Sequence, residues 1–511
     1  MVLHSLLFEH ADDPRRVAPS DMPAYFVDLN LDQVVDAIAK PNPEYELRSI
    51  WYRPLATVDE VVYRQEIFRD IERLGLFEVL RVFSEKMRAT RRSLASLDKI
   101  YSTYHRKGWF LEAACAYCDA VREIMEHLGG VEPESRGLKA LKSYLLQYAA
   151  REAFTSIAAE ASGLKDDLGG IHYCVTLKDL TVKVRMYDSE IDYGTDIEQT
   201  FERFSQKEAG SYRSKYPDSA GIDHVQGQIL DCVAKLYPAI FARLDAFCAS
   251  HASFIDDTVD AFEHEVQFYL SWLEYSAPLR RSGLEFCLPV LSATDKAISA
   301  NGMFDLALAK KAAMAASSIV TNDISIHGKE RILVVTGPNQ GGKTTFARVF
   351  GQLHHLASIG CLVPAQEARL FLFDRMFTHF EREETLKSHH GKLHEELLHI
   401  HESLGAATTR SILILNEAFT STTLKDSLFL SRRIIDKIAS LDLLCVCVTF
   451  LEELASGNEK VVSLVGRVDS RDPSIRTFKI ERLPADGLAY ARSLAEKYHL
   501  TYERLKERVG S

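Results

Sequence analysis

Apolar residues recur at the spacing of α-helices over two long stretches of the chain. From about residue 46 to 165 they repeat every three or four positions with few helix breakers, most regularly over 138–158, and Gly163 is expected to end that helix. The same spacing returns over 222–275. Pro238 should interrupt this second stretch, because proline has no backbone N–H to donate to the preceding turn.

The pattern between these helical stretches is that of a small β-hairpin. Two short strands are expected over 171–175 and 180–186, around a turn at Leu177–Asp179. Alternate residues of a strand point to opposite faces, so the second strand should have one apolar and one polar face. The apolar face would contain Val182, Val184 and Met186, and the polar face Thr181, Lys183 and Arg185.

From Arg331 onwards strands and helices alternate, which predicts a mostly parallel sheet covered by helices. The clearest strands are expected over 332–335, 412–415 and 443–449. A hairpin should turn at 470–473, and two short helices should follow over 488–509. The pattern therefore predicts a multidomain protein with a largely helical first part and an α/β second part.

Length and composition support a globular chain of more than one domain. Its 511 residues exceed what one hydrophobic core usually organises, and 46% hydrophobic with 26% charged residues is typical of globular proteins. No run of about 18 apolar residues is present, so no membrane span is expected. Residues 1–8 are apolar but have no basic lead, which argues against a secretory signal and favours the cytoplasm.

The net charge of −11 restricts the kind of nucleic-acid contact that the chain can make. It has the wrong sign for a protein with a large nonspecific footprint on nucleic acid. A local basic strip, or a dimer that encircles the duplex, is compatible with this charge.

The strongest chemical signal is Gly337-Pro-Asn-Gln-Gly-Gly-Lys-Thr344, a full match to GxxxxGK[ST] between an apolar strand and a helix. In such a P-loop, or Walker A motif, glycines let the backbone curl so that its N–H groups point at phosphate oxygens. Lys343 is expected to act in catalysis on the β- and γ-phosphates of ATP, and the Thr344 hydroxyl to coordinate Mg²⁺. The expected nucleotide-binding residues are Gly337, Pro338, Asn339, Gln340, Gly341, Gly342, Lys343, Thr344 and Thr345.

A second motif of this kind of site follows the strand over 412–415, which ends in Asn416-Glu417. Glu417 is placed to orient or deprotonate the attacking water, which makes it a catalytic candidate. The usual residue before it is Asp, which holds Mg²⁺ through a water, whereas the amide of Asn416 contributes less charge to that second shell. We expect nucleotide binding to survive this difference and hydrolysis to be slower.

Two patterns that resemble metal sites are better explained without a metal. His394 and His399 are five residues apart, whereas the HExxH motif of metalloproteases needs a separation of four to place both on one helix face. His390 and His394 share a face, but no third ligand is evident. Cys115 and Cys118 form one CxxC in a helical run, without the second pair of a zinc site. A polar helix face and buried thiols are the favoured interpretations.

These segments together resemble the MutS family of DNA mismatch-repair ATPases. Thr336–Thr345 is similar to the family's P-loop, in which Pro-Asn and the double glycine are distinctive. Three later segments resemble the parts of the family's ATPase domain that follow: Gly360–Ala365, Asp374–Thr378 and Asn416–Thr423. The resemblance is strong over 331–510 and weaker over 46–300.

The resemblance implies a domain organisation. Residues 1–45 would be an N-terminal extension, 46–300 a helical core and lever domain with a clamp-like β-containing insertion at 166–221, and 301–511 an α/β P-loop ATPase domain of ABC type with C-terminal dimerisation helices. The roughly 45 residues before the core are too few for the mismatch-binding and connector domains of many relatives, so no mismatch-wedging site is expected.

The resemblance also implies ligands and partners. ATP and Mg²⁺ would bind between the two subunits of a homodimer, and double-stranded DNA, mismatched or branched, would be the partner. In the clamp-like insertion, Lys178, Lys183 and Arg185 are the best candidates for phosphate contacts. A solvated face explains these three cations equally well, because acidic residues are close in sequence, namely Asp179, Asp188, Glu190 and Asp192.

Three departures from the family's pattern all concern hydrolysis. Besides Asn416, Gly391 begins the segment where the family has a Ser-Thr-Phe that reaches the partner's γ-phosphate, and Phe450 stands where it has His. Lys392 is a candidate to supply that charge to the partner. The departures leave a second interpretation open, a nucleotide-gated dimeric scaffold with weak or no ATPase activity. A third is a recombination-related ATPase that recognises DNA structure and has no role in mismatch repair.

Overall fold

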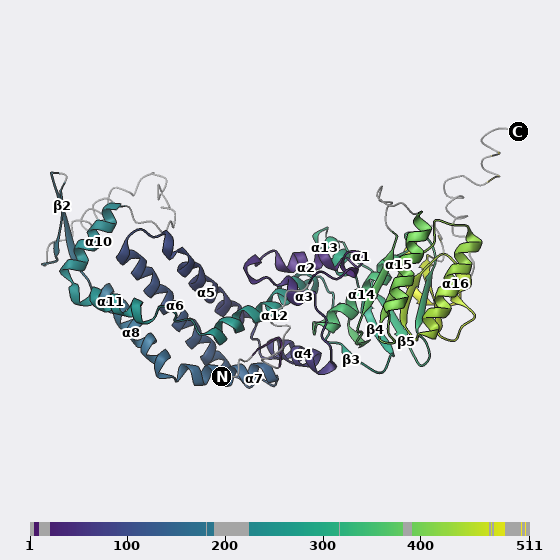
Figure 1. The fold of residues 1–511 in the computed structure, drawn as a ribbon, viewed down its shortest axis with the longest axis horizontal. Helices are drawn as coiled ribbons and strands as arrows, with labels where there is room; N and C mark the ends of the chain where they lie inside the picture. The colour runs from purple at the N-terminus through teal and green to yellow at the C-terminus, as the bar shows by residue number, and fades with distance from the viewer. Residues whose placement is uncertain are drawn as a thin grey trace. The chain divides into compact units, whose positions relative to one another are not determined.

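The described chain forms two compact units (Figure 1). The computed structural model describes residues 5–9, 21–179, 181–188, 224–315, 317–381, 391–469, 472, 475–485, 502 and 506. Unit 1 consists of 1–73, 134–137 and 264–511, and unit 2 consists of 74–133 and 138–263. No helix within the described ranges is long and apolar enough to cross a membrane.

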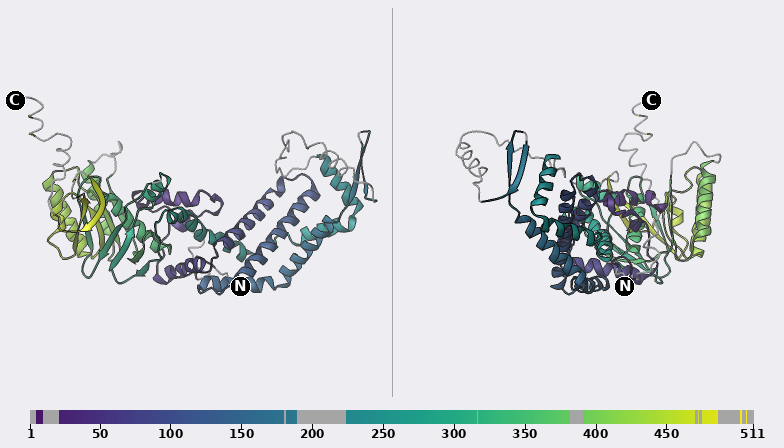
Figure 2. Two further views of the ribbon diagram at one scale, coloured as in Figure 1. Left: turned by 180° about the vertical axis from the view of Figure 1, so that it is seen from behind. Right: turned by 60° about the vertical axis from the view of Figure 1, so that its left-hand side comes forward.

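Unit 2 is built from helices that pack side by side (Figures 1 and 2). Its main helices are α5 (Phe77–Ser96), α6 (Thr103–Gly129), α8 (Glu152–Gly169), α10 (His224–Leu236) and α11 (Pro238–Ser250), with most of α7 (Arg136–Ala149) and the start of α12 (Asp257–Arg281). Phe83 of α5 stacks on Phe262 of α12 with ring centroids 5.3 Å apart. The buried hydroxyls of Tyr117 and Tyr148 lie 2.9 Å apart, which joins α6 to α7.

The helix ends of unit 2 confirm one expected break and correct another. Pro238 is the first residue of α11, so it interrupts the helical stretch as predicted. Gly163 was expected to end a helix, but it lies inside α8, which continues to Gly169. An interior glycine costs a helix only about 1 kcal/mol relative to alanine, and buried neighbours such as Leu164 offset that cost. The break falls earlier, between Ala149 and Glu152.

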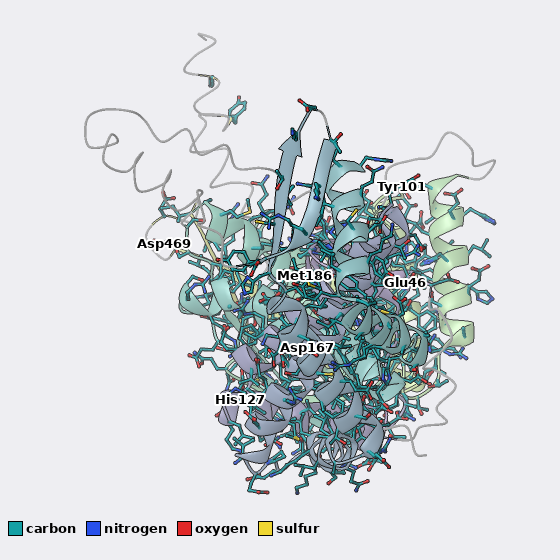
Figure 3. All side chains as sticks on the ribbon, turned by 90° about the vertical axis from the view of Figure 1, so that its left-hand side faces the viewer. Glu46, Tyr101, His127, Asp167, Met186 and Asp469 are labelled. Carbon is teal, nitrogen blue, oxygen red and sulfur yellow. The ribbon has the colours of Figure 1, made fainter. Side chains whose placement is uncertain are left out.

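Unit 2 also contains the predicted hairpin, which Figure 3 shows above Met186. Strands β1 (Tyr173–Lys178) and β2 (Thr181–Met186) pair antiparallel, and Lys178 lies opposite Thr181. The turn is therefore centred after Lys178 and not at Leu177–Asp179, and Asp179 takes a left-handed conformation with φ of 48°. The predicted alternation holds over most of β2: Val182 and Val184 are half-buried, whereas Thr181, Lys183, Arg185 and Met186 are exposed.

Unit 1 contains a six-stranded sheet with the order β12-β11-β6-β10-β9-β8. The strands are β6 (Ile332–Thr336), β8 (Met376–Phe380), β9 (Ile412–Asn416), β10 (Leu444–Val448), β11 (Val461–Val468) and β12 (Arg476–Arg482). All neighbours are parallel except β11 and β12. Every residue of β6, β9 and β10 is buried, as expected for central strands covered on both faces. The three predicted strands and the C-terminal hairpin are thus confirmed.

Helices cover both faces of this sheet. On one face, α15 (Lys392–Ala406) and α16 (Leu424–Ser440) share a core with Ile332, Leu413 and Cys445 of the strands. On the other, α14 (Lys343–Ser358) brings Gly351 so close to Ile414 that an added Cβ would lie 3.0 Å from that side chain.

A second, four-stranded sheet has the order β3-β7-β4-β5. Its strands are β3 (Val290–Ser292), β4 (Ile298–Met303), β5 (Asn322–Ile326) and β7 (Glu367–Phe371), and α13 (Leu306–Met314) connects β4 to β5. The helices expected over 488–509 lie outside the described residues, apart from Tyr502 and Lys506.

The N-terminal segment is an integral part of unit 1. Its helices are α1 (Tyr25–Asp28), α2 (Leu31–Ala39), α3 (Arg48–Trp51) and α4 (Val58–Arg73). The Tyr25 hydroxyl lies 3.1 Å from Nδ1 of His355, and the Gln352 amide donates to the carbonyl of Leu29 at 2.9 Å, both on α14. The compact units are a different division from the predicted domains, whose boundaries at residues 45 and 300 stay predictions.

Candidate nucleotide-binding site

The glycine-rich loop connects the end of β6 to the start of α14, and its backbone needs glycine. Gly337 has φ of 121° and Gly342 has φ of 91°, both in the left-handed region. A Cβ on Gly337 would lie 2.8 Å from the backbone nitrogen of Gly466 on β11. A Cβ on Gly341 would lie 2.9 Å from the carbonyl oxygen of Pro338. The loop therefore packs too tightly for side chains, and its backbone is available to a ligand at the N-terminus of a helix.

Lys343 places a buried cation inside this loop. The residue is 4% exposed, and its Nζ donates to the carbonyl oxygens of Gly337 at 2.9 Å and Pro338 at 3.1 Å. Burial lowers the pKa of Lys343, while the nearby carboxylate of Glu417 opposes that change. Exchanging two carbonyl oxygens for phosphate oxygens would give this ammonium a full counter-charge.

Asn416 and Glu417 lie at the same edge of the sheet as the loop. Asn416 pairs with Val448 of β10, which in turn pairs with Val335 of β6, so two strand spacings, roughly 10 Å, separate the ends of β9 and β6. Glu417 has φ of 53°, and its N–H donates to the Val448 carbonyl at 2.9 Å. This left-handed turn leaves the Glu417 side chain half-exposed beside Lys343.

The donor set at this edge fits a hydrated Mg²⁺ ion. Asn416 is 7% exposed, and its Oδ1 is buried with no hydrogen-bond partner among the described residues. A buried amide oxygen without a donor is costly unless a ligand or water supplies one. Mg²⁺ keeps several waters and takes oxygen ligands, so a metal-bound water could donate to Oδ1 while the half-buried Thr344 hydroxyl contacts the ion.

Strand β12 adds residues to the site that motif reasoning did not identify. The Arg476 Nε donates to the Asn339 carbonyl of the loop at 3.3 Å. Phe478, with φ of 59°, comes within 3.7 Å of the position that a Cβ on Gly342 would take. Asn322 of β5 fixes this part of β12, because its amide donates to the Phe478 carbonyl and accepts from the Ile480 N–H. No spacing in the sequence links β12 to the loop, since 137 residues separate Arg476 from Asn339.

The two other positions that depart from the expected pattern, besides Asn416, lie at the start of α15 and after β10. Gly391 caps the N-terminus of α15, and Phe450 is 49% exposed. The Lys392 Nζ lies 2.6 Å from Oε1 of Glu381, a carboxylate to which the Thr420 hydroxyl also donates. The Lys392 ammonium is therefore held by its own chain.

One histidine of α15, His399, lies near His379 of β8. Nδ1 of His399 is 3.4 Å from Nδ1 of His379. No group of three or more His, Cys, Asp or Glu residues in the described part of the chain is arranged to hold a metal. His389 and His390 lie outside that part. Cys115 and Cys118 are buried in α6, and burial raises the pKa of Cys118 to about 12, so it behaves as a small apolar residue.

The fold and site define an α/β chain with a glycine-rich strand–loop–helix at the carboxyl edge of a parallel sheet. Residues 333–479, which contain this loop and all but the ends of the six-stranded sheet, match the family model described as MutS domain V. This part of the chain is therefore similar to domain V of the MutS family.

Curated relatives match the same C-terminal part of the chain at modest identity. The DNA mismatch repair protein MutS of Brevibacillus brevis is 31% identical over 183 residues, 35% of this chain and 21% of the relative. MutS of Shouchella clausii is 38% identical over 121 residues, 24% of this chain and 14% of the relative. MutS of Lactobacillus gasseri is 30% identical over 202 residues, 38% of this chain and 23% of the relative. The matches thus span less than a quarter of the relatives' length.

Proposed function

We propose that this chain binds ATP with Mg²⁺ in the loop 337–345 and couples its nucleotide state to the binding of DNA. The observation that carries this proposal is the buried ammonium of Lys343, which lies inside a loop whose backbone requires glycine at Gly337 and Gly342. A cation that hydrogen-bonds to two neutral carbonyls at a helix N-terminus is well placed for a phosphate ligand.

Each residue of the site has a role in this proposal. The loop N–H groups and Lys343 would hold the β- and γ-phosphates. Thr344 and, through a water, Asn416 would hold Mg²⁺, which neutralises phosphate charge when bound. Glu417 would orient the attacking water, since its carboxylate is close enough to Lys343 to influence the pKa of that ammonium.

The DNA part of the proposal is supported by the relatives' name, DNA mismatch repair protein, and by the hairpin of unit 2. Lys178, Lys183 and Arg185 share the polar face of this hairpin, because cross-strand partners point to the same side. Such a row of exposed cations suits phosphate contacts, which carry no sequence information. The acidic chain would then grip DNA as a homodimer in the cytoplasm.

The test is the ATPase rate of the purified full chain, without DNA and with linear, mismatched or branched duplexes. Lys343→Ala should weaken ATP binding more than tenfold, and Glu417→Ala should keep binding and lower hydrolysis by about 100-fold or more. The exposed ion pair Lys329–Glu459 offers matched controls, because Lys329→Ala and Glu459→Ala remove the same groups away from the loop.

Stimulation of hydrolysis by DNA that is lost in Glu417→Ala supports a DNA-coupled ATPase. The DNA substrate that stimulates most strongly separates mismatch repair from recognition of branched DNA. If ATP at 100 times its Kd adds less than about 2.7 kcal/mol to the stability, the chain does not bind ATP in this way.

A nucleotide-gated scaffold with weak or no ATPase activity is the second candidate. It is favoured by the neutral amide of Asn416 and by the ion pair that holds Lys392 within its own chain. Under this proposal ATP binds, no DNA raises a negligible rate, and Asn416→Asp increases hydrolysis by restoring a charge beside Mg²⁺. A wild-type rate that DNA raises strongly would exclude the scaffold.

A further inference from the structure

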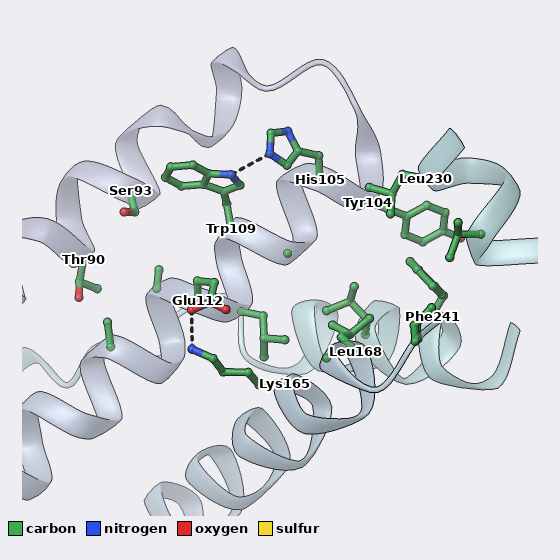
Figure 4. Close-up of a pocket in the computed structure, with 18 of the residues that line it drawn as sticks. Thr90, Ser93, Tyr104, His105, Trp109, Glu112, Lys165, Leu168, Leu230 and Phe241 are labelled. Atoms are coloured by element: carbon green, nitrogen blue, oxygen red, sulfur yellow. Dashed lines mark hydrogen bonds and ion pairs between the residues drawn. The ribbon is translucent and has the colours of Figure 1, made fainter. Parts of the chain in front are cut away.

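Unit 2 contains a cavity of about 780 Å³ that the proposed nucleotide and DNA contacts do not use (Figure 4). Five helices line it: α5, α6, α8, α10 and α11. Interiors normally close-pack and leave few voids larger than a water molecule. A space of this size is within the range of small-molecule pockets, about 300–1,000 Å³.

Small residues of α6 line one wall of the cavity, and aromatic rings form other parts of its lining. Gly108 lines the cavity, and a Cβ added there would meet nothing within 4 Å. Ala113 and Ala116 continue the same wall at helical spacing. The rings of Trp109 and Phe241 come from α6 and α11 and lie on different sides of the space in Figure 4. The cavity can therefore accept a flat ring against aromatic walls.

The polar groups that line the cavity neutralise one another. The Lys165 Nζ lies 2.7 Å from Oε2 of Glu112, and both side chains are more than half exposed, so this ion pair lies at the solvent side. The indole N–H of Trp109 donates to Nε2 of His105 at 2.8 Å. Burial lowers the pKa of His105, which favours the neutral form of the imidazole. Of the described lining residues, none presents a charge without a counter-charge.

We propose that this cavity binds a neutral, mostly apolar molecule of drug size that carries an aromatic ring. A charged ligand would lose its hydration without gaining a counter-ion, whereas a neutral ring gains contact with Trp109 and the apolar helix faces. The site is separate from the P-loop, so its occupancy does not depend on the proposed ATP function.

Two related dyes test the size and charge of the ligand. N-phenyl-1-naphthylamine is neutral, and 8-anilino-1-naphthalenesulfonate is a similar ring system with a sulfonate. With the full chain, we expect saturable 1:1 binding of the neutral dye with energy transfer from tryptophan. The sulfonate should bind at least tenfold more weakly. Trp109→Phe should lower the transfer, because Trp109 lines the cavity whereas Trp51 and Trp272 do not.

A pair of glycine substitutions locates the bound dye. Gly108→Leu should fill part of the cavity and weaken binding of the neutral dye at least tenfold. Gly163→Leu is the matched control, because it also sits in a helix with nothing within 4 Å of its Cβ and does not line the cavity. Both substitutions replace an interior helical glycine, so folding should be kept or improved.

Three results would overturn the proposal. The first is neutral-dye binding that does not saturate. The second is that both glycine variants lose binding of the neutral dye equally, or that neither variant loses it. The third is tighter binding of the sulfonate, which would indicate a site for anions.

Discussion

At the residue scale, the candidate nucleotide site depends on tight packing around its glycines. Gly337→Ala would place a methyl group 2.8 Å from the Gly466 nitrogen and at a φ of 121°, which alanine rarely adopts. We expect this variant to lose ATP binding by more than tenfold while the rest of the sheet stays folded. Titration with a fluorescent ATP analogue measures the loss. Gly405→Ala, on α15 with nothing within 4 Å of the added Cβ, should bind ATP like the parent chain.

Two neighbouring histidines of α14 make unit 1 sensitive to mild acid. Burial lowers the pKa of both His354 and His355 from 6.5 to about 4. Between pH 6.5 and 4 the unfolded chain therefore binds more protons at these two histidines than the folded chain does. Their contribution should lower the free energy of unfolding as the pH decreases from 6.5 to 4, and it should level off below pH 4. The full effect of one such shift is roughly 3 kcal/mol. Denaturant unfolding at several pH values measures it, and His355→Gln should flatten the slope. An equal slope in this variant would contradict the prediction.

At the scale of elements, single side chains decide where helices begin. Thr423 caps α16, since its hydroxyl accepts the Asp426 N–H at 3.2 Å and donates to the Asp426 carboxylate at 2.8 Å. Thr423→Ala should lower the free energy of unfolding by about 1 kcal/mol. Thr155→Ala, at an exposed position inside α8, is the control and should change it by less than half as much. Thermal unfolding of the three chains compares them.

The elements that the sequence pattern predicts well are the buried strands whose residues are almost all apolar. Ile332–Thr336 and Ile412–Asn416 are apolar almost throughout because both faces of the sheet are covered, and the motifs at their ends follow directly. The pattern missed the break after Ala149 because no proline or glycine marks it. The pattern also did not predict that Arg476 and Phe478 lie beside the glycine-rich loop. The pairing of β12 with β11 brings them there, and such pairing depends on tertiary structure.

At the scale of the whole molecule, one carboxylate connects the two sheets of unit 1. Asp442 accepts hydrogen bonds from Lys296, between β3 and β4, and from Arg331 and Lys460, next to β6 and β11. Partial burial of this half-buried carboxyl group raises its pKa, but the hydrogen bonds from the three cations outweigh that effect and lower the pKa below 3.8.

Asp442→Asn should therefore destabilise unit 1 at neutral pH. We expect a loss of about 1–2 kcal/mol, since the side chain is partly exposed and solvent screens the three pairs. A carboxyl group whose pKa is lowered by folding stabilises the folded chain above pH 3.8. This stabilisation is lost as the pH falls through the pKa that the group has in the folded chain. The difference between variant and parent should thus shrink below pH 4, which urea unfolding can follow. If the difference in the free energy of unfolding between variant and parent stays constant with pH, the charge of Asp442 is not its cause.

The packing of the N-terminal segment against α14 also has a consequence for synthesis. Tyr25 contacts His355, 330 residues later, while all of unit 2 lies between them in the chain. At roughly 5–20 residues per second, the ribosome needs about 15 to 60 s to make that interval. Unit 2 can finish folding as it emerges, but Tyr25 and Leu29 must wait for α14. The nascent chain therefore exposes these two side chains to chaperones throughout that interval.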